Sequence, residues 1–278
     1  MKIYLLGGTG YIGSWIEKYF LNKAYDLQVL KTDVTDLERV RETLKNVRDS
    51  VLINATGKTG KPNVDWCEDH RLETTEVNVN GAINVAKVAT KQGNYVIQIG
   101  SGCIFSGPGD YAFTEEDEPN FFGSFYSQTK AVSEGALKEI PNVCILRIRM
   151  PLQGSPNPKN LLDKLLQYKK ILSVPNSVTV IEDFMPFLER VIEKKPVGVL
   201  NAVNPGSYEH RDLLERYREQ IEPKRVFEYI TLEQFQGMTK APRSNCVLST
   251  AGCEKLGITM PNVSISLPRL IDAYAKAK

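Results

Sequence analysis

Short runs of apolar residues alternate along the first half of the chain with longer segments in which apolar positions recur every three or four residues. Apolar runs of this length predict buried strands, and the three-to-four periodicity predicts amphipathic helices. The expected strands are Ile3–Leu6, Leu27–Leu30, Val51–Asn54, Tyr95–Ile99 and Val143–Ile148. The expected helices are Tyr11–Asn22, Leu37–Val47, Glu73–Lys91 and Ser127–Glu139. This alternation predicts an α/β fold with a parallel sheet covered on both faces by helices.

The pattern becomes irregular after Arg149. Prolines divide this part into short pieces, at Pro151, Pro156, Pro158 and Pro175. Helices are expected at Phe184–Glu193, at Arg211–Gln220 and from Leu267 onward, with a short strand near Val199. We therefore predict a Rossmann-type, doubly wound domain over residues 1–150 and a smaller C-terminal substrate-binding lobe over residues 151–278. Some elements of the lobe are expected to return to the sheet.

Composition and charge exclude several classes of function. The chain has 278 residues and a net charge of only +2, from 35 basic and 33 acidic residues. A balance this close to neutral gives no polybasic surface, so neither nucleic acid nor a membrane is expected as a partner. The five cysteines have neither a zinc-site spacing nor a CxxC pair, so no metal site is expected and a reducing compartment is favoured. The first apolar run leaves no room for a signal peptide and no run is long enough to span a membrane, which favours the cytoplasm.

A glycine-rich turn joins the first expected strand to the first expected helix. It reads Gly7-Gly8-Thr9-Gly10-Tyr11-Ile12-Gly13. Glycine permits a tight turn and a close approach of the backbone to a pyrophosphate, and the N–H groups of the following helix favour phosphate. The alternative is a plain strand–helix turn, but this context is the one in which the motif binds dinucleotides. We expect cofactor contacts from Gly7, Thr9, Gly10, Tyr11, Ile12 and Gly13.

The residues after the second expected strand bear on the choice between NAD and NADP. Proteins that bind NAD usually place an acid there for the ribose hydroxyls. Here the strand ends in Leu30-Lys31-Thr32, and Lys31 could contact a 2′-phosphate. We therefore expect NADPH/NADP+ as cofactor, with a solvated surface lysine as the alternative for Lys31. Asp33 is a candidate for contact with the adenine edge, or for the cap of the helix that follows.

A Tyr-x-x-x-Lys pair lies at the start of the helix expected near residue 127. Tyr126 and Lys130 are four residues apart, which places them on one helix face. The charge of Lys130 is expected to lower the pKa of Tyr126 from about 10 and to favour proton exchange near neutrality. Ser101 ends the preceding strand, where its hydroxyl can polarise a carbonyl group that the tyrosine protonates. Together these residues predict reduction of a carbonyl group by hydride.

Cys103 lies two residues beyond Ser101. A thiol at this place would face the same carbonyl group. Free cysteine has a pKa of about 8.5, which is within reach of acid/base chemistry when a cation is close. The alternative is that Cys103 is a small buried hydrophobic residue.

Several further segments are distinctive: Asn63–Glu68, Gly102–Phe105, Glu115–Phe121, Gly123–Ser127, Val143–Pro151, Val174–Ser177 and Ala241–Asn245. With the glycine loop they resemble, in order along most of the chain, the nucleotide-rhamnose synthases. These are bifunctional 3,5-epimerases and 4-reductases of the extended short-chain dehydrogenase/reductase superfamily. In the same superfamily, a segment similar to Asn54-Ala55-Thr56-Gly57 lies along the cofactor, and an asparagine matching Asn78 lies on the next helix; either could be structural here.

The resemblance implies a substrate and a second acid/base group. The substrate would be UDP- or dTDP-4-keto-6-deoxy-D-glucose, converted to the corresponding L-rhamnose nucleotide by 3,5-epimerisation and NADPH-dependent 4-reduction. Cys103 and Lys170 would be the acid/base groups of the epimerisation, since Lys170 matches a lysine of the family. Some members have an acid where this chain has Lys169, so the electrostatics around Lys170 could differ.

The resemblance also implies how the nucleotide sugar is bound. Arg243 would hold the diphosphate, because a guanidinium group suits bidentate contacts with phosphate. Asn63, Asp65 and Trp66 would line the sugar pocket, with packing as the alternative for Trp66. A homodimer is usual in the superfamily and is the expected assembly.

Three other functions remain open. A single-function reductase of the dTDP-4-keto-rhamnose type would need the Ser–Tyr–Lys set but neither Cys103 nor Lys170. A GDP-fucose-synthase-type enzyme would pair the cysteine with a histidine, and neither His70 nor His210 occupies an obvious matching position. A non-catalytic nucleotide-binding regulatory subunit of the same fold would be expected to lose the Tyr-x-x-x-Lys pair.

Overall fold

A six-stranded sheet forms the centre of the computed structural model, which describes residues 2–278. The strands lie in the order β2-β1-β3-β4-β6-β8, and every neighbouring pair is parallel. Their bounds are β1 (Lys2–Leu6), β2 (Asp26–Leu30), β3 (Val51–Asn54), β4 (Tyr95–Ser101), β6 (Val143–Ile148) and β8 (Gly198–Asn201). The predicted Rossmann-type parallel sheet is therefore confirmed.

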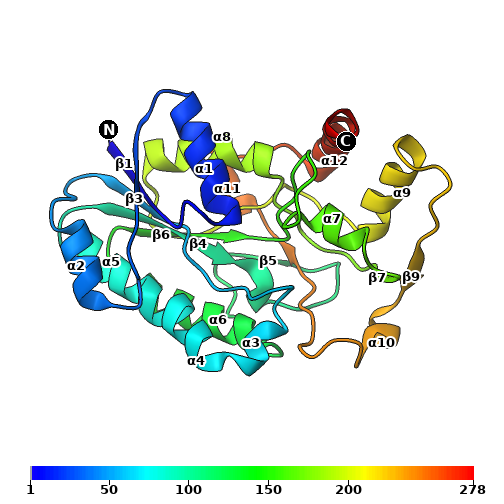
Figure 1. Ribbon diagram of the computed structural model, residues 1–278, viewed down its shortest axis with the longest axis horizontal. Helices are drawn as coiled ribbons and strands as arrows, with labels where there is room; N and C mark the ends of the chain where they lie inside the picture. The colour runs from blue at the N-terminus through cyan, green and yellow to red at the C-terminus, as the bar shows by residue number, and fades with distance from the viewer. Residues whose placement is uncertain (1) are drawn as a thin grey trace.

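Helices cover both faces of this sheet (Figure 1). One face carries α1 (Tyr11–Asn22) and α8 (Ile181–Lys194), and the other carries α2 (Leu37–Leu44), α5 (Ala82–Thr90) and α6 (Phe125–Lys138). The side chains of β1 alternate between the two layers. Ile3 and Leu5 pack in the core that contains α1 and α8, whereas Tyr4 and Leu6 pack in the core that contains α2 and α5. Burial on both faces explains why β1 reads as a continuous apolar run.

The long helix predicted over Glu73–Lys91 consists of three pieces. A π-helical stretch over Glu76–Gly81 joins α4 (Arg71–Thr75) to α5. Such stretches often occur at functional sites. Here it carries Asn78, whose side chain bonds the backbone of Lys58 at 2.7 and 3.0 Å and the hydroxyl of Thr129 at 3.2 Å. Asn78 therefore ties the loop after β3 to α6.

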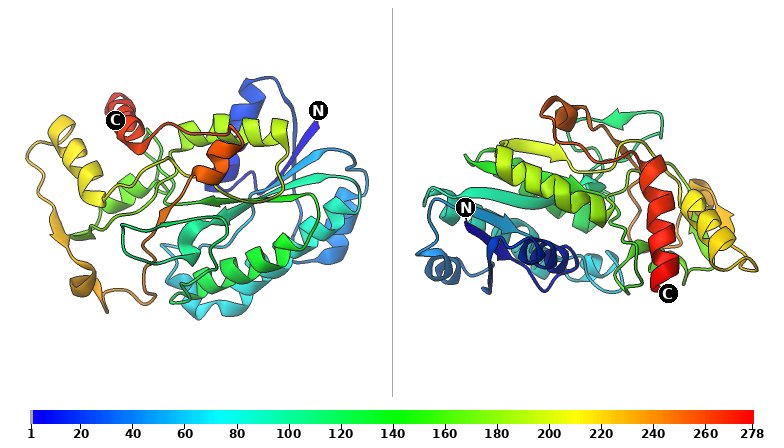
Figure 2. Two further views of the ribbon diagram at one scale, coloured as in Figure 1. Left: turned by 180° about the vertical axis from the view of Figure 1, so that it is seen from behind. Right: turned by 90° about the horizontal axis from the view of Figure 1, so that it is seen from above.

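The second half of the chain builds a further layer beside the sheet (Figure 2). Here α7 (Leu161–Leu165), α9 (His210–Gln220) and α12 (Val263–Ala277) share an apolar core. Two short parallel pairs join distant segments: β7 (Lys170–Leu172) with β9 (Glu228–Ile230), and β5 (Ala112–Phe113) with β10 (Val247–Leu248). The remaining short helices are α3 (Trp66–Asp69), α10 (Leu232–Phe235) and α11 (Ala251–Lys255). In residues 2–278 no helix has both the length and the apolar character to cross a bilayer.

Elements of the second half do return to the sheet layers. β8 pairs with β6 at the sheet edge, and α8 packs against α1. The division of the chain at residue 150 stays a prediction.

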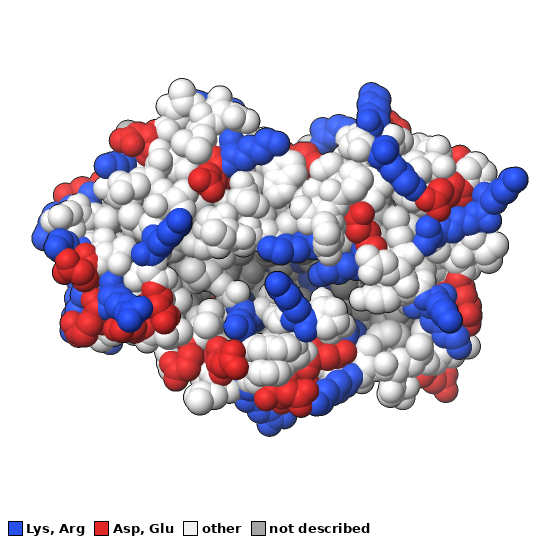
Figure 3. Space-filling model, viewed as in Figure 1, with Lys and Arg blue, Asp and Glu red and all other residues white. Residues whose placement is uncertain are grey.

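The direction of strand addition reverses at β1, because β2 lies on one side of it and β3 on the other. In open α/β sheets, ligands bind outside the carboxyl ends of the strands at such a point. The carboxyl ends of the strands point toward the part of the molecule that contains α7, α9 and α12 (Figure 1). Figure 3 shows that the molecule is hollowed in its middle, with Lys and Arg side chains standing around the hollow.

Candidate active site

The glycine loop turns tightly between β1 and α1. Gly7 has φ of +84°, and a Cβ atom on it would lie 2.7 Å from the carbonyl carbon of Ala55. A Cβ atom on Gly13 would lie 2.1 Å from the oxygen of Gly7. Within the described chain, no side chain caps α1 at Gly10, and its first turn holds no acidic residue. The N–H groups and the positive dipole end of α1 can therefore accept a pyrophosphate.

The other predicted loop residues have different surroundings. Thr9 is exposed, whereas Ile12 packs against the core under α1. The Tyr11 hydroxyl is buried and has no hydrogen-bond partner in residues 2–278. Burial, reinforced by the carboxylates of Glu182 and Asp163, raises the pKa of Tyr11 above its ordinary value. Because an unpaired buried hydroxyl is costly, Tyr11 Oη is a group that a ligand can satisfy.

The segment after β2 offers a second unpaired hydroxyl. Lys31 is exposed, while Thr32 Oγ1 is buried without a partner in the described chain. Asp33 accepts hydrogen bonds from the hydroxyl and the N–H of Thr35 at 2.7 and 3.0 Å, which lower its pKa. The residue that caps α2 is Asp36, so the capping alternative for Asp33 is wrong. Contact of Lys31 and Asp33 with a cofactor stays a prediction.

The segment after β3 lies against the glycine loop. Asn54 is fully buried, donates from Nδ2 to Gln98 Oε1 at 2.8 Å and accepts from the Thr56 hydroxyl at 2.6 Å. The Ala55 N–H donates to the carbonyl oxygen of Leu6 at 3.0 Å. Asn54 thus fixes the backbone of Ala55 and Thr56 beside the predicted cofactor site.

Ser101, Tyr126 and Lys130 meet at the carboxyl end of β4. Ser101 ends this strand, and Tyr126 and Lys130 lie in the first two turns of α6. The Ser101 hydroxyl lies near the Tyr126 side chain, where it acts to lower the pKa of the phenol. Lys130 Nζ donates to the carbonyl oxygen of Ile99 at 3.2 Å. The structure therefore brings together the three residues predicted for carbonyl reduction.

Burial governs the protonation of these groups. It lowers the pKa of Lys130 to about 8. Burial also raises the pKa of Tyr126 above its ordinary value, and the interaction with Cys103 raises it further. The expected lowering of the Tyr126 pKa is therefore wrong, because desolvation of the phenolate outweighs the attraction of the nearby Arg149 cation. Tyr126 stays a phenol at neutral pH, which suits a proton donor.

Cys103 contacts a buried cation. It lies in a 3₁₀ turn over Gly102–Ile104, and its N–H donates to Ser101 Oγ at 3.2 Å. Arg149, one residue beyond β6, donates from Nη1 to Cys103 Sγ at 2.8 Å. The thiol group therefore belongs to the same cluster as Ser101 and Tyr126.

Sequence reasoning assigned no role to Arg149 or His210. The imidazole Nδ1 of His210 is bonded to the carbonyl oxygen of Leu172 at 2.8 Å, so Nδ1 carries the proton. Nε2 is buried and has no partner in the described residues. Burial, with the charge of Arg149, lowers the pKa of His210 to about 4. The one sequence signal for Arg149 was its place beside Arg147 in the otherwise apolar run at β6.

Lys170, the predicted partner of Cys103, lies elsewhere. It begins β7, is exposed, and places Nζ 3.4 Å from Glu228 Oε1. The structure does not bring it to hydrogen-bond distance of the cysteine. Two residues further on, Leu172 bonds His210, so the end of β7 does approach the cluster.

The chain matches the RmlD substrate binding domain over residues 1–275. It is 37% identical over 248 residues to a bifunctional dTDP-4-dehydrorhamnose 3,5-epimerase/dTDP-4-dehydrorhamnose reductase from Arabidopsis thaliana, a match that covers 87% of this chain and 82% of that protein. The chain belongs to the RmlD substrate-binding family.

Other relatives of this RmlD-family chain include longer proteins. It is 36% identical over 263 residues to a trifunctional UDP-glucose 4,6-dehydratase/UDP-4-keto-6-deoxy-D-glucose 3,5-epimerase/UDP-4-keto-L-rhamnose-reductase of Arabidopsis thaliana; the match covers 92% of this chain and 39% of that protein. The chain thus spans about two fifths of the length of that relative.

Solved structures share the fold over nearly the whole chain. The L780 UDP-rhamnose synthase from Acanthamoeba polyphaga mimivirus superposes with a TM-score of 0.93 at 29% identity, covering 98% of this chain and 99% of that one. A dTDP-4-dehydrorhamnose reductase from Bacillus anthracis in complex with NADP has a TM-score of 0.84 at 19% identity over 100% of both chains, which shows the fold alone.

The predicted substrate-binding residues of the RmlD-family chain form one cluster. Arg243 Nη1 donates to Asp65 Oδ1 at 2.7 Å, and Nη2 lies 3.5 Å from Asn63 Oδ1. Trp66 stacks on His70 with ring centroids 3.7 Å apart. The clustering fits a binding site, and contact of these residues with a sugar nucleotide stays a prediction.

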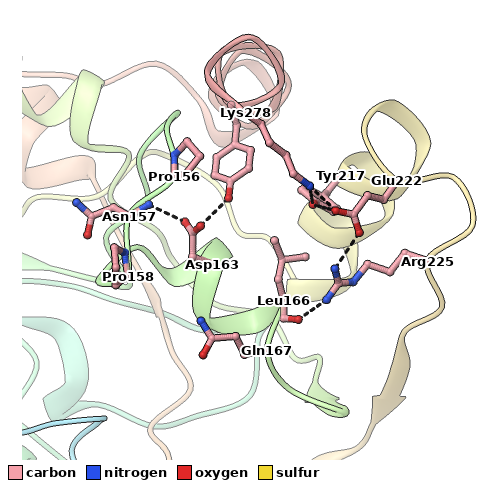
Figure 4. Close-up of a pocket in the computed structure, with 11 residues that line it drawn as sticks. Pro156, Asn157, Pro158, Asp163, Leu166, Gln167, Tyr217, Glu222, Arg225 and Lys278 are labelled. Atoms are coloured by element: carbon pink, nitrogen blue, oxygen red, sulfur yellow. Dashed lines mark hydrogen bonds and ion pairs between the residues drawn. The ribbon is translucent and has the colours of Figure 1, made fainter.

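A separate cavity of about 450 Å³ lies among α7, α9 and α12. Figure 4 shows that Lys278 and Arg225 are both bonded to Glu222, whereas Asp163 is bonded to the backbone of Asn157 and to Tyr274. None of the predicted catalytic residues lines it. We place the active site at the strand ends instead, because the acid/base groups are there. Within residues 2–278, no group of three or more His, Cys, Asp or Glu side chains is arranged to hold a metal ion.

Proposed function

We propose that this chain is an NADPH-dependent oxidoreductase that converts UDP- or dTDP-4-keto-6-deoxy-D-glucose to the corresponding L-rhamnose nucleotide. It would combine 3,5-epimerisation with 4-reduction at one site. The observation that carries the proposal is the meeting of Cys103 with Ser101 and Tyr126 at the carboxyl end of β4. Reduction needs the serine, the tyrosine and Lys130, and epimerisation adds the need for a further acid/base group near the same carbonyl.

The residues present fit a bound dinucleotide. The uncapped N-terminus of α1 would hold the pyrophosphate, and Lys31 would contact a 2′-phosphate. The unpaired hydroxyls of Tyr11 and Thr32 would gain partners at this surface. When bound, NADPH supplies the hydride that reduces C4. Lys130 would hold the ribose next to the nicotinamide.

Tyr126 would carry the proton for the reduction. Its phenol is protonated at neutral pH and lies near the Ser101 hydroxyl. It can therefore donate a hydrogen bond to the C4 carbonyl oxygen and then a proton as that oxygen becomes an alkoxide. The positive charge of Lys130 would stabilise the phenolate that remains.

The same hydroxyl groups would support epimerisation. The C4 ketone acidifies the protons on C3 and C5, because the electron pair of each broken C–H bond moves onto the C4 oxygen as an enolate. Tyr126 and Ser101 would stabilise that oxygen. Inversion needs a proton to leave one face and another to arrive on the opposite face. We propose Cys103 and Lys170 as the two acid/base groups.

The nucleotide part of the substrate would bind in the cluster around Arg243. Its guanidinium group would contact the diphosphate, and Asn63, Asp65 and Trp66 would line the sugar pocket. The basic side chains around the hollow in Figure 3 support the binding of an anionic ligand to this face of the molecule. The neighbouring Asp65 accepts a hydrogen bond from the same guanidinium group and would compete with the diphosphate for it.

Turnover by the purified chain alone tests this function. UDP-4-keto-6-deoxy-D-glucose and NADPH would be supplied without any other enzyme, and the loss of NADPH and the identity of the product would be followed. We expect an L-rhamnose nucleotide, and no turnover by Tyr126→Phe. A product that keeps the D-gluco configuration at C3 and C5 would reduce the function to 4-reduction. Binding of NADPH without turnover of any keto-sugar would favour the non-catalytic alternative.

A further inference from the structure

The guanidinium group of Arg149 is deeply buried and has no carboxylate partner. The residue is 2% exposed. Its hydrogen-bond partners in the described chain are Cys103 Sγ, Asn176 Oδ1 and the carbonyl oxygen of Ser244, and its Nε is buried without one. A buried cation costs several kcal/mol of lost solvation unless an anion or a full set of hydrogen bonds compensates. Two of the partners are neutral oxygen atoms, so the sulfur is the one contact that can carry a negative charge.

Among the groups that face Cys103, Arg149 is the one that can compensate a negative charge on the sulfur by direct contact. Tyr126, on α6, stays a neutral phenol because burial raises its pKa. Burial likewise raises the pKa of the Cys246 thiol, which donates to a backbone carbonyl at 3.2 Å. Lys130 is the second cation near the sulfur, but its ammonium is bonded to a backbone carbonyl of β4. The hydrogen bond of 2.8 Å from Arg149 is the direct contact of a cation with Sγ.

The orientation of the Arg149 guanidinium group is fixed by contacts of Nη2, the nitrogen that does not face Cys103. Nη2 donates to Asn176 at 2.8 Å and to the backbone of Ser244, both in the second half of the chain. Because the guanidinium is planar, these contacts also set the direction of Nη1. A lysine ammonium group at this place has no planar pair of nitrogen atoms that could bond Asn176 and Cys103 together. A positive charge alone would therefore not reproduce the contact.

We propose that Arg149 holds the sulfur of Cys103 as a thiolate and thereby makes Cys103 the base of the epimerisation; this inference rests on the function proposed above. The thiolate removes a proton from the carbon next to the C4 ketone, so that the C–H bond breaks and an S–H bond forms. The electron pair of the C–H bond moves onto the C4 oxygen as an enolate. A second acid then returns a proton to the opposite face of the carbon, and the C4 carbonyl re-forms with the configuration inverted.

The rate of alkylation of Cys103 tests the charge directly. Iodoacetamide would be added to the full chain at pH 7 without substrate or cofactor, and the peptide containing Cys103 would be followed by mass spectrometry. An ordinary thiol is only a few per cent ionised at this pH. Arg149→Met should therefore slow the alkylation about tenfold or more. Arg190→Met, on an exposed side chain of α8, is the matched control and should leave the rate unchanged.

A second variant keeps Arg149 and so controls for any loss of packing in Arg149→Met. Asn176→Asp keeps the size of the side chain and places a carboxylate at Nη2, where it competes with the sulfur as counter-ion. It should slow the alkylation of Cys103 in the same way. Equal rates in the wild-type chain, Arg149→Met and Asn176→Asp would overturn the proposal.

Deuterium uptake separates this inference from the function on which it rests. In deuterated water, Arg149→Met should lower the rate of uptake at C3 and C5 by at least the factor by which alkylation slows. Uptake that is unchanged in the variant would overturn the role of Arg149 in epimerisation. If the wild-type chain shows no uptake while the alkylation rates differ as expected, the thiolate contact stands and the epimerase function fails.

Discussion

Burial decides, residue by residue, which protons the site can move. Tyr126 stays protonated because its phenolate would lose solvation, while Lys130 loses its proton more easily, with a pKa near 8. The two pKa shifts have opposite directions: the pKa of Tyr126 is raised and that of Lys130 is lowered. In the proposed mechanism, Tyr126 would be able to donate a proton across the working pH range, and loss of the Lys130 charge would limit the rate on the alkaline side.

The rate of reduction should therefore fall above about pH 8. Lys130 is charged below its pKa and neutral above it. The cation proposed to hold the ribose and to stabilise the Tyr126 phenolate is therefore lost as the pH rises. We expect kcat/KM for 4-reduction to fall in one protonation step, measured with an already epimerised substrate. Lys130→Arg, which stays charged in this range, should move the fall to higher pH. A wild-type profile that stays level to pH 10 would contradict this assignment.

Replacement of the thiol should separate the two half-reactions. Cys103→Ser keeps a small polar side chain but removes a group that ionises near neutrality, so deuterium uptake at C3 and C5 should fall about 10²- to 10⁴-fold. Reduction of a 4-keto-L-rhamnose nucleotide should fall much less. Equal losses in both assays would show that Cys103 serves the reduction or the packing of the site instead.

Lys170 carries a prediction of its own. If it returns the proton on the face opposite Cys103, Lys170→Met should abolish inversion at both C3 and C5. Its exposed ion-pair partner provides the matched control, since Glu228→Gln removes only a contact worth less than about 1 kcal/mol. Inversion by Lys170→Met would contradict the assignment and leave the second acid to another group, for which His210 is a candidate because its Nε2 has no partner in the described residues.

The elements of the fold determine where each of these side chains points. The glycine loop can approach Ala55 because Gly7 and Gly13 have no Cβ atom, and the Tyr–Lys pair faces β4 because both residues occupy one side of α6. Two glycines in helices differ in whether the surrounding structure leaves room for a Cβ atom. A Cβ atom on Gly13 would clash with the carbonyl oxygen of Gly7. A Cβ atom on Gly135 of α6 would meet nothing within 4 Å.

Alanine should have opposite effects at these two glycines. Gly13→Ala should destabilise the chain by about 1–3 kcal/mol through overpacking and weaken NADPH binding about tenfold or more. Gly135→Ala should stabilise it by up to about 1 kcal/mol, because alanine is the better helix former. Thermal unfolding and NADPH titration would measure both. Unchanged NADPH affinity in Gly13→Ala would show that the loop does not bind the cofactor as proposed.

At the scale of the whole molecule, one buried ion pair joins the layers under the site. Arg147 is fully buried in β6 and donates from Nε and Nη2 to Glu134 of α6 at 2.9 and 2.6 Å. Its Nη1 donates to the carbonyl oxygen of Thr114 at 3.1 Å. The helix that carries the Tyr–Lys pair is thus tied to the sheet and to the segment after β5.

Breaking this pair should be strongly destabilising. Glu134→Gln leaves the Arg147 charge buried without its counter-ion, and the free energy of unfolding should fall by about 3 kcal/mol or more. Glu193→Gln breaks an exposed pair with Arg190 and should cost less than about 1 kcal/mol. Denaturant unfolding measures both changes. A loss of similar size in the two variants would contradict the structural role given to Arg147.

The sequence predicted the parts of the molecule that local patterns determine. The strand–turn–helix at Gly7 and the Tyr–Lys spacing depend on residues close together in the chain. The paired strands β5 and β10 were not predicted, because two residues pair there with a segment far along the chain. The contact of Arg149 with Cys103 is equally long-range. The place of Cys103 beside Ser101 indicated the cysteine, but no local pattern indicated that Arg149 contacts it.

Deuterium labelling of the product tests most directly the central claim that one site performs both half-reactions. The wild-type chain would be incubated in deuterated water with NADPH and UDP-4-keto-6-deoxy-D-glucose, and the product would be examined by NMR. The account predicts an L-rhamnose nucleotide that carries deuterium at C3 and C5. A reduced sugar that keeps its original protons and configuration at both carbons would contradict it.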